Sequence, residues 1–121
     1  MSITVLTIDD SKAIRDMVAF SLQPHGYRVI GAADGAEGLE KLRAERPALV
    51  ITDLNMPVMN GIDFIRNARK EAAGAGVPIV MLTTESKPEL KAEGKAAGAT
   101  GWINKPFDAA MLVSVTKKLA G

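Results

Sequence analysis

Short apolar runs of strand length alternate along the whole chain with amphipathic stretches of helix length. The strand-like runs are residues 3–8, 27–32, 48–52, 79–82 and 100–104, and a helix-like stretch follows each of them. The first run, Ile-Thr-Val-Leu-Thr-Ile, is short, β-branched and mostly apolar, as expected of a strand in a buried parallel sheet. Five consecutive strand–helix units predict an α/β fold, a doubly wound parallel sheet with right-handed crossovers and helices on both faces.

Local signals mark the ends of the helix-like stretches. Asp34, followed three residues later by Glu37, has the pattern of a capping box at the start of the second stretch. The fourth stretch, about residues 88–97, is predicted to be a weak helix, because Leu90 is its only large apolar residue and Gly94 lies inside it. An element with so little apolar surface suits a segment that moves between two states.

Composition narrows the classes of function. The 121 residues include no cysteine, which excludes disulfides, thiolate metal sites and cysteine nucleophiles. The only histidine, His25, lies in a Pro-His-Gly turn, so histidine-rich zinc enzymes and His-based catalytic triads are not expected. A formal net charge of +1 gives no reason to expect nucleic acid, and no apolar run approaches the roughly 18–20 residues that span a bilayer. We expect one cytoplasmic domain over residues 1–121, monomeric by default and without an output domain.

Polar side chains follow four of the predicted strands. They are Asp9 and Asp10 after the first, Asp53 after the third, Thr83 and Thr84 after the fourth, and Lys105 after the fifth. In doubly wound sheets, ligands bind outside the carboxyl ends of the strands, where the strand order reverses. Clustered carboxylates repel one another unless a cation lies among them. Lys105 supplies one positive charge, and Mg2+ would supply the rest, since it is bound by one or two carboxylates together with a phosphate.

Transfer of a phosphoryl group onto a carboxylate is the chemistry that fits this set. It requires an exposed nucleophile, a metal that neutralises charge, and donors around the equatorial oxygens. Asp53 is the predicted nucleophile, because we expect the third strand to be central. Asp9 and Asp10 would hold the metal, while Thr83 and Lys105 would contact the phosphoryl oxygens. Each residue also has a plain interpretation, such as a helix-start acid or a turn residue, and their joint position at the strand ends favours function.

These residues form a pattern known from one protein family. The pattern consists of Asp9-Asp10, the run Asp53-Leu54-Asn55-Met56-Pro57 with Gly61, Thr83, and Lys105-Pro106, in this order over essentially the whole chain. With these motifs the chain resembles a response-regulator receiver domain. The resemblance implies a (βα)5 flavodoxin-like fold with a five-stranded parallel sheet of order 2-1-3-4-5. It also implies a signalling switch that is no enzyme in the usual sense and catalyses only its own phosphorylation and dephosphorylation.

The resemblance also assigns roles to the residues at the strand ends. Asp53 would accept a phosphoryl group from the phosphohistidine of a histidine kinase. The ligands of Mg2+ would be Asp10, Asp53 and the backbone carbonyl of Asn55, with Asp9 helping through water. The peptide bond between Lys105 and Pro106 would be cis.

Four residues near the predicted site are expected to tune the switch. Trp102 stands where receivers usually place a Tyr or Phe that changes rotamer on phosphorylation, and a plain aromatic packed at the sheet edge fits equally well. Thr84 is bulkier than the Ala or Ser common at its position, and would hinder access of a phosphoryl donor or a phosphatase. Asn55 and Glu85 resemble the pair found in receivers that dephosphorylate quickly, chiefly those of chemotaxis. The other interpretation is that both are plain loop residues.

A basic stripe lies on the predicted fourth helix, because Lys87, Lys91 and Lys95 recur at a spacing of four. Two interpretations are open. The stripe is either a solvated helix face or, together with Trp102 and the last helix, a surface that docks an acidic segment of a partner protein. Receiver domains commonly signal through this surface.

The biological role that best suits the sequence is that of a stand-alone, CheY-like chemotaxis receiver. Such a protein would take its phosphoryl group from a CheA-like kinase and bind the flagellar motor switch. One alternative is a phosphate sink or phosphorelay carrier that binds no motor. Another is an aspartyl-phosphate phosphatase, but phosphatases of the haloacid dehalogenase type carry a second Asp two residues after the nucleophile, where this chain has Asn55.

Overall fold

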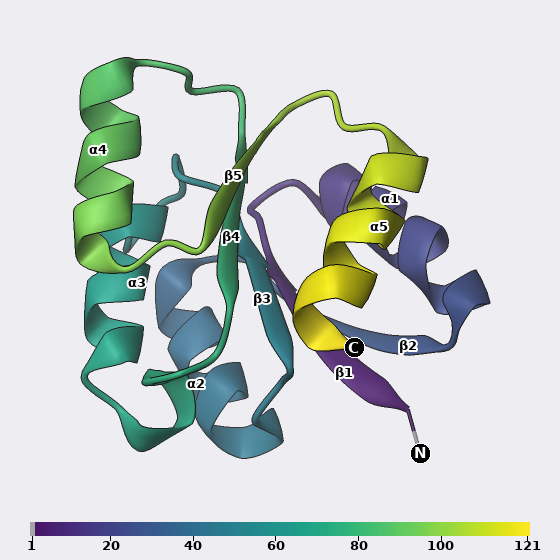
Figure 1. Ribbon diagram of the computed structural model, residues 1–121. Helices are drawn as coiled ribbons and strands as arrows, with labels where there is room; N and C mark the ends of the chain where they lie inside the picture. The colour runs from purple at the N-terminus through teal and green to yellow at the C-terminus, as the bar shows by residue number, and fades with distance from the viewer. Residues whose placement is uncertain (1) are drawn as a thin grey trace.

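The strands form one parallel sheet. In the computed structural model, which describes residues 2–121, five strands lie in the order β2-β1-β3-β4-β5 (Figure 1). The strands are β1 (Ile3–Ile8), β2 (Tyr27–Ala32), β3 (Leu49–Thr52), β4 (Ile79–Thr83) and β5 (Gly101–Asn104). This is the predicted flavodoxin-like α/β fold with the predicted strand order. The observed β3 and β5 each begin one residue later than predicted, and β4 ends one residue later.

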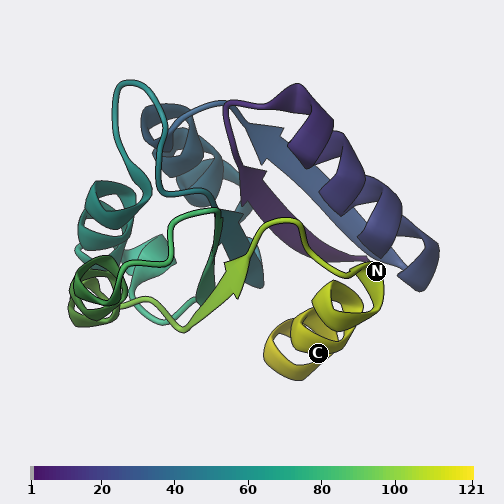
Figure 2. The ribbon, with the colours of Figure 1, turned by 90° about the horizontal axis from the view of Figure 1, so that it is seen from above.

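Helices cover both faces of the sheet. They are α1 (Lys12–Leu22), α2 (Gly35–Glu45), α3 (Gly61–Arg69), α4 (Pro88–Ala97) and α5 (Ala109–Ala120), with short 3-10 turns η1 (Gln23–His25) and η2 (Ala72–Gly74). Helices α1 and α5 lie on one face, and α2, α3 and α4 lie on the other (Figure 2). Within residues 2–121, no helix combines the length and the apolar character that crossing a membrane requires.

The two faces enclose separate cores, because successive strand residues point to opposite sides of the sheet. In β4, Ile79 and Met81 join the core under α2 and α3, while Val80 and Leu82 join the core under α1 and α5. All four side chains are at most 1% exposed. Burial on both faces explains why the central strands β3 and β4 are continuous apolar runs up to their final threonine.

Most helices begin at a residue whose side chain caps them. The Asp34 carboxylate accepts from the N–H of Glu37 at 2.9 Å, and the Glu37 carboxylate accepts from the N–H of Ala33 at 2.6 Å, so the predicted capping pair forms. Helix α4 differs, since its first flanking residue, Lys87, makes no side-chain cap. Its only fully buried residue is Gly94. The predicted weakness of this helix is therefore visible in both its start and its packing.

The sheet ladder continues one residue beyond three of the strands. The N–H of Asp9 donates to the carbonyl of Ala32, that of Asp53 to Ile8, and that of Lys105 to Thr83, at 2.9–3.0 Å. These backbone bonds hold Asp9, Asp53 and Lys105 at one edge of the sheet, although 96 residues separate the first from the last. Parallel topology thus brings the residues of the predicted site together.

Candidate functional site

Three carboxylates meet at the carboxyl end of the sheet. One oxygen from each of Asp9, Asp10 and Asp53 lies within 4.8 Å of the others. Asp9 and Asp53 are buried, at 2% and 7% exposure, whereas Asp10 is exposed. Such a cluster is repulsive by itself, so it calls for positive charge.

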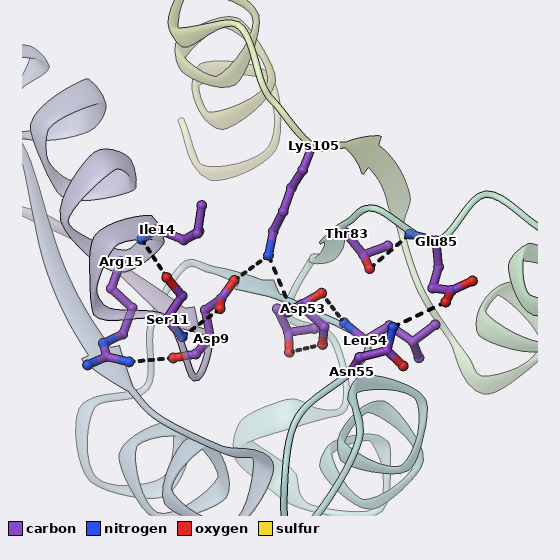
Figure 3. A network of polar contacts seen from close by, with 11 residues as sticks. Asp9, Ser11, Ile14, Arg15, Asp53, Leu54, Asn55, Thr83, Glu85 and Lys105 are labelled. Atoms are coloured by element: carbon purple, nitrogen blue, oxygen red, sulfur yellow. Dashed lines mark hydrogen bonds and ion pairs between the residues drawn. The ribbon is translucent and has the colours of Figure 1, made fainter.

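Lys105 supplies part of that charge. Its Nζ lies 2.8 Å from Oδ2 of Asp9 and 3.2 Å from Oδ2 of Asp53, bridging the two buried acids (Figure 3). The peptide bond from Lys105 to Pro106 is cis, in line with the expectation from the sequence.

The remaining oxygens of the buried acids are anchored by backbone. Oδ1 of Asp9 accepts from the N–H of Ser11 at 2.9 Å, and Oδ1 of Asp53 accepts from the N–H of Leu54 at 2.7 Å. Among residues 2–121, no hydrogen bond involves the Asp10 carboxylate, so it is open to a ligand.

Burial and the surplus of negative charge shift the pKa values of Asp9 and Lys105. Desolvation raises the pKa of Asp9 above its usual value and outweighs the hydrogen bonds from Lys105 and Ser11. Desolvation also works to lower the pKa of Lys105, but the hydrogen bonds and charges of Asp9 and Asp53 together outweigh it and raise that pKa. The protonated form of Lys105 is therefore favoured, and ionisation of Asp9 costs more free energy than ionisation of a solvent-exposed aspartate.

The donor set fits Mg2+. The cluster offers hard oxygen ligands, one of them on an exposed and unbonded carboxylate that leaves room for water, and Mg2+ favours such partly hydrated sites. A divalent ion would also offset the charge that Lys105 leaves uncompensated. The backbone carbonyl of Asn55, two residues after Asp53, remains a predicted ligand.

The loop after β4 joins the predicted switch residues. Thr83 is fully buried, and its hydroxyl accepts from the N–H of Glu85 at 3.2 Å. The side-chain amide of Asn55 donates to the Glu85 carboxylate at 3.3 Å, so this predicted pair is in direct contact. Thr84, the next residue, is exposed.

Trp102 is held against this loop. Its indole Nε1 donates to the carbonyl of Glu85 at 3.0 Å, and its ring packs against the core under α2 and α3. The ring lies over Gly94 of α4, where a Cβ would stand only 2.9 Å from Cζ3 of Trp102. The sequence marks Gly94 as out of place in a helix, but it does not reveal that the glycine makes room for the indole.

The basic stripe is exposed and borders one of two hollows that Trp102 lines. Lys91 and Lys95 are exposed on α4, and Lys87 is exposed at the residue just before it. Lys91, Lys95 and Trp102 line a hollow of about 320 Å3. A second hollow, of about 250 Å3, lies between β5 and α5 and includes Trp102 and Lys118. Of the residues predicted to form one partner surface, Lys91, Lys95 and Trp102 therefore lie side by side, whereas Lys87 lines neither hollow.

A flavodoxin-like sheet that ends in an acidic cluster bridged by a lysine defines the receiver class of signalling proteins. The chain matches the family model "Response regulator receiver domain" over residues 5–117. It belongs to this family, whose members are signalling switches of two-component systems and receive a phosphoryl group from a histidine kinase or another donor.

Three relatives indicate the range of roles in the family. Chemotaxis protein CheY4 of Vibrio cholerae has a structure that matches with a TM-score of 0.93 at 46% identity, over 98% of this chain and 99% of that chain. Protein PilH of Pseudomonas aeruginosa is 32% identical over 97% of this chain and 98% of its own length. The alkaline phosphatase synthesis transcriptional regulatory protein SphR of Synechococcus elongatus is 37% identical over 95% of this chain. The chain spans only 48% of SphR, and about half the length of several other curated relatives that it matches.

Proposed function

We propose that this protein is a phosphorylation switch of a two-component system. It accepts a phosphoryl group from a histidine kinase on Asp53 with the help of Mg2+, and then binds a protein partner through the surface of α4, β5 and α5. The observation that carries this proposal is the meeting of Asp9, Asp10, Asp53 and Lys105 at one sheet edge. In this proposal the protein acts in the cytoplasm, and the reaction is transfer of a phosphoryl group to and from its own Asp53. It does not catalyse the conversion of a separate substrate.

The geometry around Asp53 suits a nucleophile. Its Oδ1 is held by the Leu54 N–H, and its Oδ2 lies beside the Lys105 ammonium. In the transfer, a carboxylate oxygen of Asp53 forms a bond to phosphorus while the bond from phosphorus to the kinase imidazole nitrogen breaks, and that nitrogen keeps the electron pair. Lys105 then neutralises an oxygen of the bound phosphoryl group.

Asp9, Asp10 and Asp53 would hold Mg2+, which when bound would neutralise charge on the phosphoryl oxygens. The Asn55 carbonyl completes the proposed ligand set. Asn55, two residues after Asp53, is hydrogen-bonded to Glu85, and this pair would orient the water that removes the phosphoryl group. The exposed Thr84 would limit access of a phosphatase to the same edge.

The loop after β4 would transmit the conformational change from the phosphorylated Asp53 to the partner surface. The phosphoryl group attracts the Thr83 hydroxyl, which now accepts from Glu85, and the Glu85 carbonyl in turn accepts from Trp102. A shift of Thr83 therefore moves the group that holds the indole. Trp102 and the neighbouring Lys91 and Lys95 would then present a changed surface to an acidic segment of the partner.

Chemotaxis is the role that we favour, with a CheA-like kinase as donor and the flagellar motor switch as partner. The similarity to a chemotaxis protein over nearly the full length of both chains supports it. A phosphate sink or relay carrier is the second candidate, because it requires the same acidic site and no partner surface. The similarity to PilH over almost its full length keeps roles other than motor binding open.

A backbone NMR titration with Mg2+ and then beryllofluoride, a stable phosphoryl mimic, tests the proposal. With metal we expect shifts at Asp10 and Asp53, which spread with the mimic to Thr83, Trp102 and α4. Asp53→Asn is the control and should lose the response to the mimic. Shifts confined to the acidic edge would favour a sink or carrier, and no response to either ligand would contradict the proposed chemistry.

A charge reversal tests the partner surface separately. Lys91→Glu should weaken binding of the beryllofluoride-loaded protein to a motor-switch peptide by about tenfold, since it turns attraction of an acidic segment into repulsion. Phosphorylation of Asp53 should be unchanged. Lys41→Glu on α2 makes the same charge change away from this surface and should leave binding intact. Equal loss of phosphorylation and binding in Lys91→Glu would argue against a separate output surface.

A further inference from the structure

A guanidinium approaches the acidic edge from the side opposite to Lys105. Arg15 extends from α1, and its Nη1 donates to the backbone carbonyl of Asp9 (Figure 3). That carbonyl belongs to the peptide group that joins Asp9 to Asp10. Among residues 2–121, Arg15 makes no ion pair with a carboxylate, so its guanidinium is directed at this backbone group alone.

A glycine in β2 makes room for this side chain. Gly31 is paired with Thr7 of β1, and a Cβ at Gly31 would stand 3.2 Å from Cδ and 3.5 Å from Nε of Arg15. Glycine weakens the interior of a strand and often marks a close approach of another group. Here the aliphatic part of Arg15 passes over the bare backbone of Gly31 on its way to Asp9.

The contact determines how the predicted metal ligands are presented. The N–H of Asp9 is held by Ala32, the Asp9 carboxylate by Ser11, and the Asp9 carbonyl by Arg15. The Arg15 bond holds the carbonyl of the peptide group between Asp9 and Asp10, while the other two bonds hold the backbone and side chain of Asp9 just before it. The Asp10 carboxylate has no hydrogen bond of its own among the described residues, so its direction depends on this peptide group.

We propose that Arg15 is a positioning residue for the metal site, an inference that rests on the proposed binding of Mg2+ at Asp9, Asp10 and Asp53. Arg15 orients the Asp9–Asp10 peptide and thereby directs Asp10 toward the cation. Groups that orient metal ligands in this way typically change metal affinity by 10- to 100-fold when they are removed.

The test is the dissociation constant of Mg2+, measured by calorimetry at fixed pH and ionic strength. Arg15→Met keeps the aliphatic chain and should weaken Mg2+ binding by about tenfold. Gly31→Ala leaves every charge in place but brings a methyl group into close contact with the Arg15 side chain, and it should weaken Mg2+ binding by about threefold. Arg15→Lys should restore part of the affinity, because it returns the charge and one donor. Lys12→Met on the same helix removes one exposed charge and should change binding by less than about twofold.

The second measurement separates affinity from chemistry. At saturating Mg2+, Arg15→Met should be phosphorylated by a small-molecule phosphodonor at nearly the wild-type rate, because Arg15 touches no reacting atom. An unchanged Mg2+ dissociation constant in Arg15→Met would overturn the inference, and so would an equal loss in Lys12→Met, which would indicate general charge repulsion. If the wild-type protein binds no Mg2+, the proposed function fails and this inference with it. Circular dichroism and unfolding midpoints establish that each variant is folded.

Discussion

Replacement of Gly94 by alanine should disturb Trp102, and the structure supplies the size of the effect. A Cβ at this position would lie 2.9 Å from Cζ3 of the indole, 3.6 Å from Cε3 and 4.0 Å from Cη2. Carbon atoms pack at about 3.5–4.0 Å, so the ring must withdraw by about 0.6 Å. The same movement stretches the bond of 3.0 Å from Trp102 to the Glu85 carbonyl toward the limit of a hydrogen bond.

Two opposing terms decide the stability of this variant. Alanine in a helix interior is better than glycine by about 1 kcal/mol. Overpacking against a ring typically costs about 1–3 kcal/mol, and loss of the indole hydrogen bond costs about 1 kcal/mol. We therefore expect Gly94→Ala to be less stable by about 1–3 kcal/mol, although the substitution improves helix propensity. In a chain of this size, that corresponds to a fall in Tm of about 4–12 °C.

Trp102 is the only tryptophan, so its fluorescence reports directly on the ring. Gly94→Ala should shift the emission to longer wavelength and increase quenching by acrylamide. Ala92→Gly on the exposed face of α4 should cost about 1 kcal/mol without any spectral change. In a Trp102→Phe background the shorter ring removes the clash, and Gly94→Ala should become stabilising by about 1 kcal/mol.

The sign of the change in stability on Gly94→Ala shows whether contact with the indole outweighs the gain in helix propensity. If Gly94→Ala in the wild-type background raises the stability and leaves the emission unchanged, then Gly94 does not accommodate the indole and the reasoning is wrong. If Trp102→Phe fails to reverse the sign, then the strain lies elsewhere in α4.

Two further substitutions test the charge balance of the site and the anchoring of α4. Asp9→Asn should raise the Tm at pH 7 in the absence of metal, because desolvation raises the pKa of Asp9 in the folded protein. Because the pKa of Asp9 is higher in the folded protein, its protonated form contributes fully to stability below the unfolded pKa of about 3.8. That contribution is lost as the pH rises through the folded pKa. The gain in Tm from Asp9→Asn should therefore disappear in acid. An unchanged Tm at pH 7 would contradict this assignment. Arg69→Met removes donors to the carbonyls of Gly74, Val77 and Gly98, bonds of 2.6–3.2 Å, and should cost about 3 kcal/mol in urea unfolding. Amide exchange should increase around Gly98, and a loss below about 1 kcal/mol would show that water replaces these bonds.

The sequence predicted the order of elements and the residues of the acidic edge. Apolar runs, the capping pair Asp34 and Glu37, and the weak segment around Gly94 are local signals, and each one depends on neighbours within a few residues. Because parallel strands end at the same edge, the polar residues after them could be assigned to one site from the sequence alone. The structure brings Asp9, Asp53 and Lys105 together as predicted.

The partners of single side chains could not be predicted in the same way. Arg15 donates to a backbone carbonyl, Arg69 donates to three of them, and Trp102 bonds to the carbonyl of Glu85. A carbonyl is present in every residue, so no residue type in the sequence signals these contacts.

Pattern and chemistry in the sequence therefore determined the fold class, the strand ends and the acidic residues beside Lys105. Only the tertiary structure decided that Gly31 makes room for Arg15 and that Gly94 makes room for Trp102. The reason is that both depend on the distance at which two elements pack. That distance is determined by all the side chains between the sheet and its helices acting together, and no local stretch of sequence contains it.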